Sequence, residues 1–194
     1  MPSRGRARSR ALFARAAFAA VSVALSVAGA TTFALGQAHL AVASADFHPG
    51  GMLPRRAASA FCGGANVSPE LHWSGAPPQT RGFVVTMFDP DARSGAGFWH
   101  WIVYDIPARV HRLKSVTNGS ALPHGAAAAT NDIGTQDYRG PCPPRGELHH
   151  YRFTVYALRT SFVSAQTTRR GPTIVRRITP YLLARGTLTG TYRR

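Results

Sequence analysis

Acidic residues are scarce in this chain of 194 residues. Only 8 residues are Asp or Glu, against 23 Lys or Arg, so the formal net charge is +15. That balance favours anionic partners in general, but it does not choose among nucleic acid, lipid headgroup and phosphate. Charged residues make up 16% of the chain and hydrophobic residues 44%, which excludes an intrinsically disordered protein. The length predicts one domain with room for an extension.

Several motifs of catalysis and recognition are missing. No Gly-x-Ser-x-Gly sequence occurs, which argues against a hydrolase with that kind of serine nucleophile. The absence of Cys-x-x-Cys and of zinc-type spacing makes the cysteines poor candidates for metal ligands. No nucleic-acid-binding motif is recognisable, so we expect no nucleic-acid partner despite the positive charge. Nothing in the sequence calls for a cofactor.

The first 45 residues have the composition of a targeting segment. An arginine-rich start is followed by a run without charge from Ala16 to Gly36, and then by small residues at positions 41–45. A basic, an apolar and a small-residue region in this order are typical of a secretory signal peptide. We therefore predict cleavage after Ala45 and an exported domain of residues 46–194, periplasmic or secreted. An uncleaved membrane anchor is the alternative, since about 20 apolar residues can span a bilayer.

The two cysteines, Cys62 and Cys142, both lie in the part that would be exported. In an oxidising compartment an even pair is read as one disulfide. Such a bridge would close a long loop, which the chain-entropy model values at roughly 4 kcal/mol. Two free buried thiols are the alternative.

Short β-branched and aromatic segments bounded by Gly, Pro or Asp predict a mainly β, antiparallel domain. Three such strands are expected, at Arg81–Phe88, Phe98–Ile106 and Tyr151–Leu158. One helix is expected at Pro172–Ala184, and Pro180 inside it predicts a kink or a break. The segment Thr187–Tyr192 is expected to form a closing strand.

Strand alternation predicts a cluster of polar side chains. His100 falls on the same face of its strand as Phe98 and Ile102, and His149 shares a face with Tyr151. If the first strand stays extended, Asp89 and Asp91 also point the same way, and a Pro-Asp step suits a sharp turn at a sheet end. The candidate cluster consists of Asp89, Asp91, His100, His149 and Tyr151.

Five motifs in order carry a resemblance to a known family. They are Asn66-x-Ser68-Pro69-x-Leu71-x-Trp73, Asp89-Pro90-Asp91-Ala92, Phe98-Trp99-His100-Trp101, the run from Tyr138-x-Gly140-Pro141 through His149-x-Tyr151-x-Phe153, and Leu188-Thr189-Gly190-Thr191-Tyr192. Together they resemble the phosphatidylethanolamine-binding protein family, in its bacterial Raf-kinase-inhibitor-like branch. The resemblance covers residues 46–194.

The resemblance implies a large antiparallel sheet packed on a smaller one, with short peripheral helices. It also implies a small anion pocket for phosphate or a phospholipid headgroup such as that of phosphatidylethanolamine. The pocket residues implied by position are Asp89, Asp91, His100, His149 and Tyr151, with Gly140 and Pro141 as a wall. A non-enzymatic binding protein is implied, with a kinase- or protease-inhibitor-like role toward a protein target. Two positions depart from the family pattern, Arg93 in place of a proline and His150 in place of an arginine.

Two aspartates beside a phosphate repel it unless protons intervene. We expect a phosphate monoanion that donates its O–H to a carboxylate while imidazole N–H groups and the tyrosine hydroxyl donate to its other oxygens. Protonated histidines would balance the aspartates, so anion binding should strengthen as the pH falls. The alternative function is a metal-assisted hydrolase built on the same Asp and His residues, because carboxylate and imidazole also bind metals.

Overall fold

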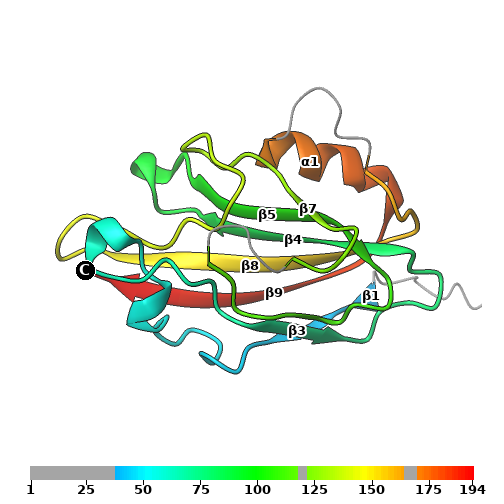
Figure 1. Ribbon diagram of the computed structural model, residues 1–194, viewed down its shortest axis with the longest axis horizontal. Coiled ribbons are helices and arrows are strands. Elements are labelled where there is room, and N and C mark those ends of the chain that lie inside the picture. Colours follow the sequence, from blue (N-terminus) through cyan, green and yellow to red (C-terminus); the bar gives the residue numbers. More distant parts are fainter. Residues whose placement is uncertain (1–37, 118–121, 164–169) are drawn as a thin grey trace, which may run out of the picture. The chain divides into compact units, whose positions relative to one another are not determined.

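The computed structural model describes residues 38–117, 122–163 and 170–194, which form two β-sheets with short helices around them (Figure 1). The large sheet has six strands in the order β1-β9-β8-β4-β5-β7, and the small sheet has three in the order β2-β3-β6. The mainly β fold expected from the sequence is confirmed. Among the described residues, no helix is long and apolar enough to cross a membrane.

Strands make up most of the regular secondary structure of the described residues. The strands are β1 (Ala38–His39), β2 (Ala41–Ala43), β3 (Leu71–Ser74), β4 (Gly82–Asp89), β5 (Phe98–Pro107), β6 (Arg112–Leu113), β7 (Ala127–Ala128), β8 (Leu148–Leu158) and β9 (Leu182–Arg193). The helical elements are short: η1 (Arg55–Ala57), η2 (Ala60–Cys62), η3 (Arg93–Gly95), α1 (Gly171–Ile178) and η4 (Thr179–Tyr181).

Strand β4 lies at the centre of the large sheet, antiparallel to both β5 and β8. It is rich in β-branched and aromatic residues and is buried on both faces over most of its length, as expected of a central strand. Strand β8 pairs with β9 over its whole length. The three strands predicted from the sequence are therefore neighbours, and their bounds differ from the prediction by at most a few residues.

The helix near the C-terminus is shorter than predicted. α1 ends at Ile178, and Pro180 lies in the 3-10 turn η4 instead of continuing the helix to Ala184. Proline has no N–H to donate and its ring collides with the preceding turn, so the helix stops there. The closing strand predicted at residues 187–192 is correspondingly longer, because β9 already begins at Leu182.

Two apolar cores hold the sheets together. The larger core lies between the two sheets and includes Trp73 from β3 together with Phe83 and Phe153 from the large sheet. The smaller core lies on the other face of the large sheet, where Ile174 and Ile178 of α1 pack with residues such as Ile102 of β5. Because successive strand side chains point to opposite faces, one set of strands supplies both cores.

The folded domain begins upstream of Asp46, the expected start of the exported chain. β1 pairs in parallel with β9, β2 pairs antiparallel with β3, and Leu40 between them is fully buried. Gly186 of β9 accommodates this crossing, because a Cβ there would lie 2.1 Å from the Leu40 carbonyl oxygen. The segment 38–43 thus joins the two sheets. Most of the predicted signal peptide lies outside the described residues, and its cleavage after Ala45 stays a prediction.

The burial of Leu40 gives a direct test of this arrangement. We expect Leu40→Ala to lower the free energy of unfolding by about 2–5 kcal/mol, because it removes packed methyl groups and leaves a cavity. Leu148→Ala is the matched control, since Leu148 is 41% exposed and its loss should change stability by less than about 0.5 kcal/mol. Urea unfolding of both variants measures the difference. Equal destabilisation would contradict the structural role of segment 38–43.

Candidate functional site

The predicted polar residues meet at one end of the large sheet. Asp89 is the last residue of β4, His100 lies near the start of β5, and His149 and Tyr151 lie at the start of β8. Because β4 is antiparallel to both neighbours, its end and their beginnings lie at the same edge. His149 and Tyr151 are two positions apart, so they face the same side of the sheet.

These side chains line a pocket of about 620 Å³. Of the predicted binding residues, Asp89, Asp91, His100, Gly140, His149 and Tyr151 all contribute to its wall. Pro141 does not line the pocket; it is buried behind the wall, and its carbonyl accepts the Ser59 N–H at 2.9 Å. Lining residues not predicted from the sequence include Ser94, Phe98, Ile133, Arg139, Pro143 and Glu147.

Asp89 is a buried carboxylate at the floor of the pocket, only 2% exposed. Its Oδ1 accepts the backbone N–H groups of Asp91 and Ala92 at 2.9 and 3.1 Å. Its Oδ2 lies 2.8 Å from His149 Nδ1 and 3.9 Å from His100 Nε2. Burial by itself raises the pKa of Asp89, but these two imidazoles and the Asp91 amide outweigh it and lower the pKa below 3.8. The carboxylate is therefore ionised at neutral pH.

His149 lies between two carboxylates. Its Nδ1–H donates to Asp89, and its Nε2 lies 3.3 Å from Glu147 Oε2. Burial lowers the pKa of His149, but the hydrogen bonds to Asp89 and Glu147 and the charges of Asp89 and Asp91 raise it above 6.5 overall. Since carboxylates only accept hydrogen bonds, the doubly protonated imidazolium satisfies both contacts.

His100 is oriented by the opposite wall. Its Nδ1 lies 2.7 Å from the Arg139 carbonyl oxygen, which can only accept, so Nδ1 carries a hydrogen. Its Nε2 faces Asp89 Oδ2 at 3.9 Å, and this imidazole helps to lower the pKa of that carboxyl. The rings of Phe98 and Tyr151 pack against the imidazole at 4.6 and 5.3 Å between centroids. His100 thus has one fixed ring orientation in the pocket.

Tyr151 is fully buried, yet its hydroxyl has no hydrogen-bond partner among the described residues. Burial raises the pKa of this phenol, and the negative charge of Asp89 raises it further. The hydroxyl is therefore a neutral donor at any physiological pH. Buried polar groups almost always have a partner, so this hydroxyl is an exception among the polar groups that line the pocket.

Asn66 positions the wall opposite His100, a role that the sequence analysis missed. Its Nδ2 donates to the Tyr138 carbonyl at 2.8 Å, and its Oδ1 accepts the Gly140 N–H at 2.8 Å. Asn66 has a φ of 53°, a left-handed conformation that asparagine adopts more readily than most residues. Because Asn66 lies far from the pocket motifs in sequence, only its place in the opening motif, Asn66-x-Ser68-Pro69, could have indicated it.

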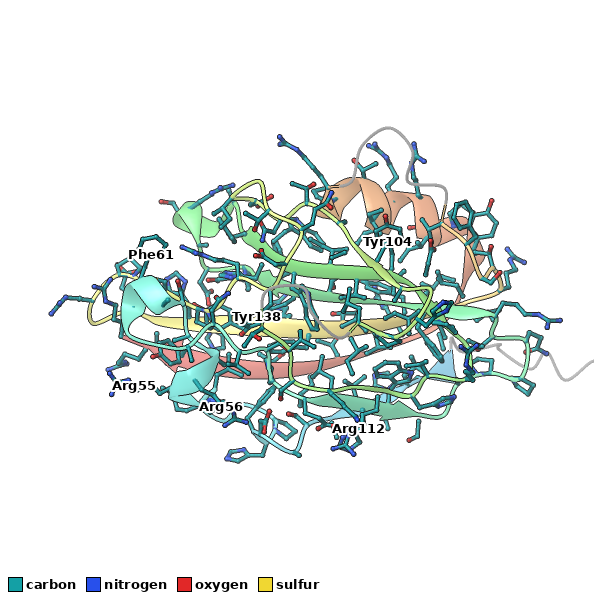
Figure 2. The ribbon with its side chains drawn as sticks, viewed as in Figure 1. Arg55, Arg56, Phe61, Tyr104, Arg112 and Tyr138 are labelled. Carbon is teal, nitrogen blue, oxygen red and sulfur yellow. A yellow bond between two sulfur atoms is a disulfide. The ribbon has the colours of Figure 1, made fainter. Side chains whose placement is uncertain are left out.

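The same wall is bound covalently to η2. Cys62 and Cys142 form the predicted disulfide, across a sequence separation of 80 residues, and Cys142 lines the pocket. Tyr138, labelled in Figure 2, lies at the start of the wall and is buried, and its hydroxyl donates to the Ala57 carbonyl at 3.0 Å. The wall is therefore fixed at several points to the segment around η1 and η2.

Of the two departures from the family pattern, Arg93 lines the pocket and His150 contacts Asp91, which lines it. His150 donates its N–H to Asp91 Oδ2 at 2.6 Å, and its ring nitrogen lies 2.9 Å from the same oxygen. Burial raises the pKa of Asp91, but these contacts outweigh it and lower the pKa. The Arg93 guanidinium lies 4.8 Å from the Phe98 ring centroid and 3.5 Å from Asp132. Arg93 thus adds a cation beside the pocket.

The alternative of a metal-assisted hydrolase is not favoured by this geometry. Within residues 38–117, 122–163 and 170–194, no three His, Cys, Asp or Glu side chains are grouped so that they could hold a metal ion. The potential ligands are committed elsewhere: Asp89 Oδ1 accepts two backbone amides, and His100 Nδ1 donates to a carbonyl.

A sheet-on-sheet fold with a pocket of carboxylate, imidazole and phenol groups at one sheet end defines a small-ligand binding protein. The model of the family described as "Phosphatidylethanolamine-binding protein" matches residues 43–193. The chain belongs to this family, as its motifs indicated.

Known relatives agree with that assignment. The Escherichia coli protein YbcL is 40% identical over 135 residues, covering 68% of this chain and 74% of its own. Its crystal structure, described as a member of the mammalian PEBP family, matches with a TM-score of 0.76 over 81% of this chain and 99% of that one. A Mycobacterium tuberculosis protein named "Putative lipoprotein LppC" is 39% identical over 66% of this chain and 60% of its own. A carboxypeptidase Y inhibitor, solved in complex with its proteinase, shares the fold, with 20% identity, a TM-score of 0.50 and coverage of 81% and 83%.

The raised pKa of His149 predicts a pH-dependent contribution to stability. Because the pKa of His149 is higher in the folded than in the unfolded protein, protonation of His149 stabilises the fold. This stabilisation is complete below the ordinary histidine pKa near 6.5 and is lost as the pH rises through the folded-state pKa. We expect His149→Gln to cost about 1.5–3 kcal/mol at about pH 5.5, the range of a hydrogen bond to a charged group, and less at about pH 8. The exposed His124→Gln is the control. Denaturant unfolding of the wild type and the variant at both pH values measures the loss of stability. A larger loss at the higher pH would contradict the raised pKa of His149.

Proposed function

We propose that this protein is an exported, non-enzymatic binding protein whose pocket takes phosphate or a phosphorylated headgroup. The observation that carries the proposal is the buried, unpartnered Tyr151 hydroxyl at the pocket floor. A hydroxyl in that position costs free energy unless a ligand oxygen accepts its hydrogen bond. Asp89 lies near enough to this hydroxyl to raise its pKa but makes no well-formed hydrogen bond with it, and we infer that an anion oxygen accepts the hydrogen.

The charge distribution supports an anionic ligand. Arg93 and Arg139 are among the residues that line the pocket, and cations near a pocket attract negative charge. The charge of Asp89 is compensated by His149, whose pKa is raised, and Asp91 is hydrogen-bonded to His150. Positive residues therefore stand beside the pocket, and the Tyr151 hydroxyl lies in its wall.

The proposal also includes export of the protein and an inhibitor-like role. The basic, apolar and small-residue regions before Asp46 support export, and so does the name of the related lipoprotein from Mycobacterium tuberculosis. An inhibitor-like role toward a protein target draws on the fold shared with the carboxypeptidase Y inhibitor, and that likeness extends to the fold alone. Phosphate binding is the part that this chain's own residues support.

A conservative substitution tests the role of the hydroxyl. Tyr151→Phe removes only the unpartnered O–H, so the ligand-free protein should be as stable as the wild type or more stable. Phosphate affinity should fall about tenfold, the loss expected for one hydrogen bond to a charged ligand. Calorimetric titration of inorganic phosphate measures the affinity and thermal unfolding the stability.

The pH dependence of the same titration is a second readout. Phosphate should bind more tightly at about pH 5.5 than at about pH 8, because protonated imidazoles balance the aspartates. Absence of phosphate binding at both pH values would overturn the proposed function. Unchanged affinity of Tyr151→Phe would show that the hydroxyl does not contact the anion.

A further inference from the structure

A second cavity, of about 600 Å³, lies at the other end of the large sheet. It is lined by residues around the start of β4 and the end of β5, whereas the pocket around Asp89 lies where β4 ends and β5 begins. Since a strand rises about 3.3 Å per residue, the length of β4 separates the two sites by roughly 20 Å. The lining of the second cavity includes Arg81, Asp105, Arg109 and Phe162, so charged and aromatic side chains meet there.

A β-bulge brings Asp105 to this cavity. The pairing of β5 with β4 shifts here, so that Tyr104 (labelled in Figure 2) and Asp105 together oppose the single residue Val84. Val103 and Ile106 both lie in the core between the sheets, which strict alternation over three positions would not allow. Asp105 is therefore the extra residue, and it adopts a left-handed φ of 57°. Such a bulge re-aims a side chain, so the carboxylate lines the cavity instead of entering the apolar core.

Asp105 is a half-buried carboxylate without a cationic partner. Its Oδ1 accepts the Val163 N–H at 2.7 Å, and no cation pairs with it in the part of the chain that the structure describes. Burial raises the pKa of Asp105, and the Val163 amide offsets only part of this effect. A partly buried carboxylate is stabilised by a charge-assisted hydrogen bond. A positively charged donor on a ligand would supply one.

The same cavity contains cations that are not paired with Asp105. Arg81 precedes β4 and Arg109 follows β5, and both side chains are exposed. Among the described residues, the ion pairs between arginine and a carboxylate do not include either of them. The cavity thus holds opposite charges that do not neutralise each other.

An exposed aromatic ring lies beside these charges. Phe162 is 61% exposed, and a local turn holds its backbone, because the Thr160 hydroxyl donates to the Phe162 carbonyl at 3.1 Å and accepts its N–H at 3.4 Å. Gly82 lets this turn approach the start of β4, since a Cβ there would lie 3.1 Å from the Thr160 carbonyl oxygen. The cavity therefore combines an apolar surface with groups of both charges.

We propose that this cavity binds a small zwitterion, an α-amino acid or a short peptide, whose ammonium group contacts Asp105 and whose carboxylate contacts Arg81 or Arg109. An anion alone would be repelled by the aspartate, and a cation alone by the arginines, so only a ligand with both charges gains from both. The Phe162 ring favours an apolar or aromatic side chain on the ligand. The site is separate from the phosphate pocket and does not depend on the proposed function.

Calorimetric titration with three related probes at equal ionic strength tests the proposal. They are L-phenylalanine, N-acetyl-L-phenylalanine, which lacks the ammonium group, and L-phenylalanine amide, which lacks the carboxylate. L-Phenylalanine should bind at least about tenfold more tightly than either derivative, because each derivative loses a hydrogen bond between charged groups. The dipeptide L-phenylalanyl-L-phenylalanine separates the two sources of a zwitterion: tighter binding of the dipeptide assigns the cavity to peptides, and weaker binding assigns it to free amino acids.

Asp105→Asn removes the negative charge and keeps the structural contact. The amide oxygen can still accept the Val163 N–H, and asparagine tolerates a left-handed φ, so the variant should fold. Its affinity for L-phenylalanine should fall about tenfold, and the advantage of L-phenylalanine over the acetyl derivative should disappear. Asp137→Asn is the matched control, because Asp137 does not line the cavity. Thermal unfolding shows whether each variant is folded.

The arginines are tested in the same way. The double variant Arg81→Gln/Arg109→Gln should lose the advantage of L-phenylalanine over its amide, because no guanidinium then meets the carboxylate. Arg176→Gln is the control, since Arg176 is exposed on α1 and does not line the cavity. Its affinity for L-phenylalanine should equal that of the wild type.

Three results would overturn the zwitterion site. The first is that neither L-phenylalanine nor the dipeptide binds, or that both derivatives bind as tightly as L-phenylalanine. The second is that folded Asp105→Asn binds L-phenylalanine as tightly as the wild type. The third is competition with inorganic phosphate, which would place the amino acid in the pocket around Asp89. Independent binding is expected instead, because the two sites lie at opposite ends of β4.

Discussion

The burial of one ionised carboxylate, Asp89, determines how the end of the large sheet is built. An isolated charge at 2% exposure is very costly unless it is paired and hydrogen-bonded. Two backbone amides of the following turn and the His149 imidazole meet that requirement. The turn after β4 and the start of β8 are therefore held together by the same side chain. Removing any partner would leave the charge uncompensated.

The pairing of Asp89 also determines where other side chains of the pocket lie. His149 compensates Asp89, so the strand position of Tyr151, two residues later, is set as well. His100 is fixed separately, by the Arg139 carbonyl on a wall that Asn66 and the disulfide attach to the segment around η2. Side chains far apart in sequence thus converge through sheet pairing on one side and through a pinned loop on the other.

The pocket residues that lie on strands were predictable from the sequence, and the contacts made by the loops were not. Alternation along residues 98–106 and 149–155 placed His100, His149 and Tyr151 on defined faces, because a strand has a fixed period. No periodicity connects Asn66 to Gly140, or Arg139 to His100, so these contacts depended on the three-dimensional path of the loops. Residues 38–43 resemble a targeting segment in composition, and only the pairing of β1 and β2 and the burial of Leu40 identify them as strands. Pro180 was recognised as a break, but the first three residues of the strand that follows it, 182–184, were assigned to the helix.

The pocket is a place where local stability and ligand binding pull in opposite directions. A phenylalanine at 151 would fill the same space without leaving a hydroxyl unpartnered, and a core optimised for stability alone would favour it. Likewise His100 Nε2 and Asp89 Oδ2 lie 3.9 Å apart, farther than a well-formed hydrogen bond. Sites that violate hydrogen-bond satisfaction are expected where a ligand completes the network. In the proposed function, an anion oxygen that accepts from Tyr151 would complete the network here. The residues that are costly for the stability of this sheet end are therefore the ones that the proposal assigns to binding.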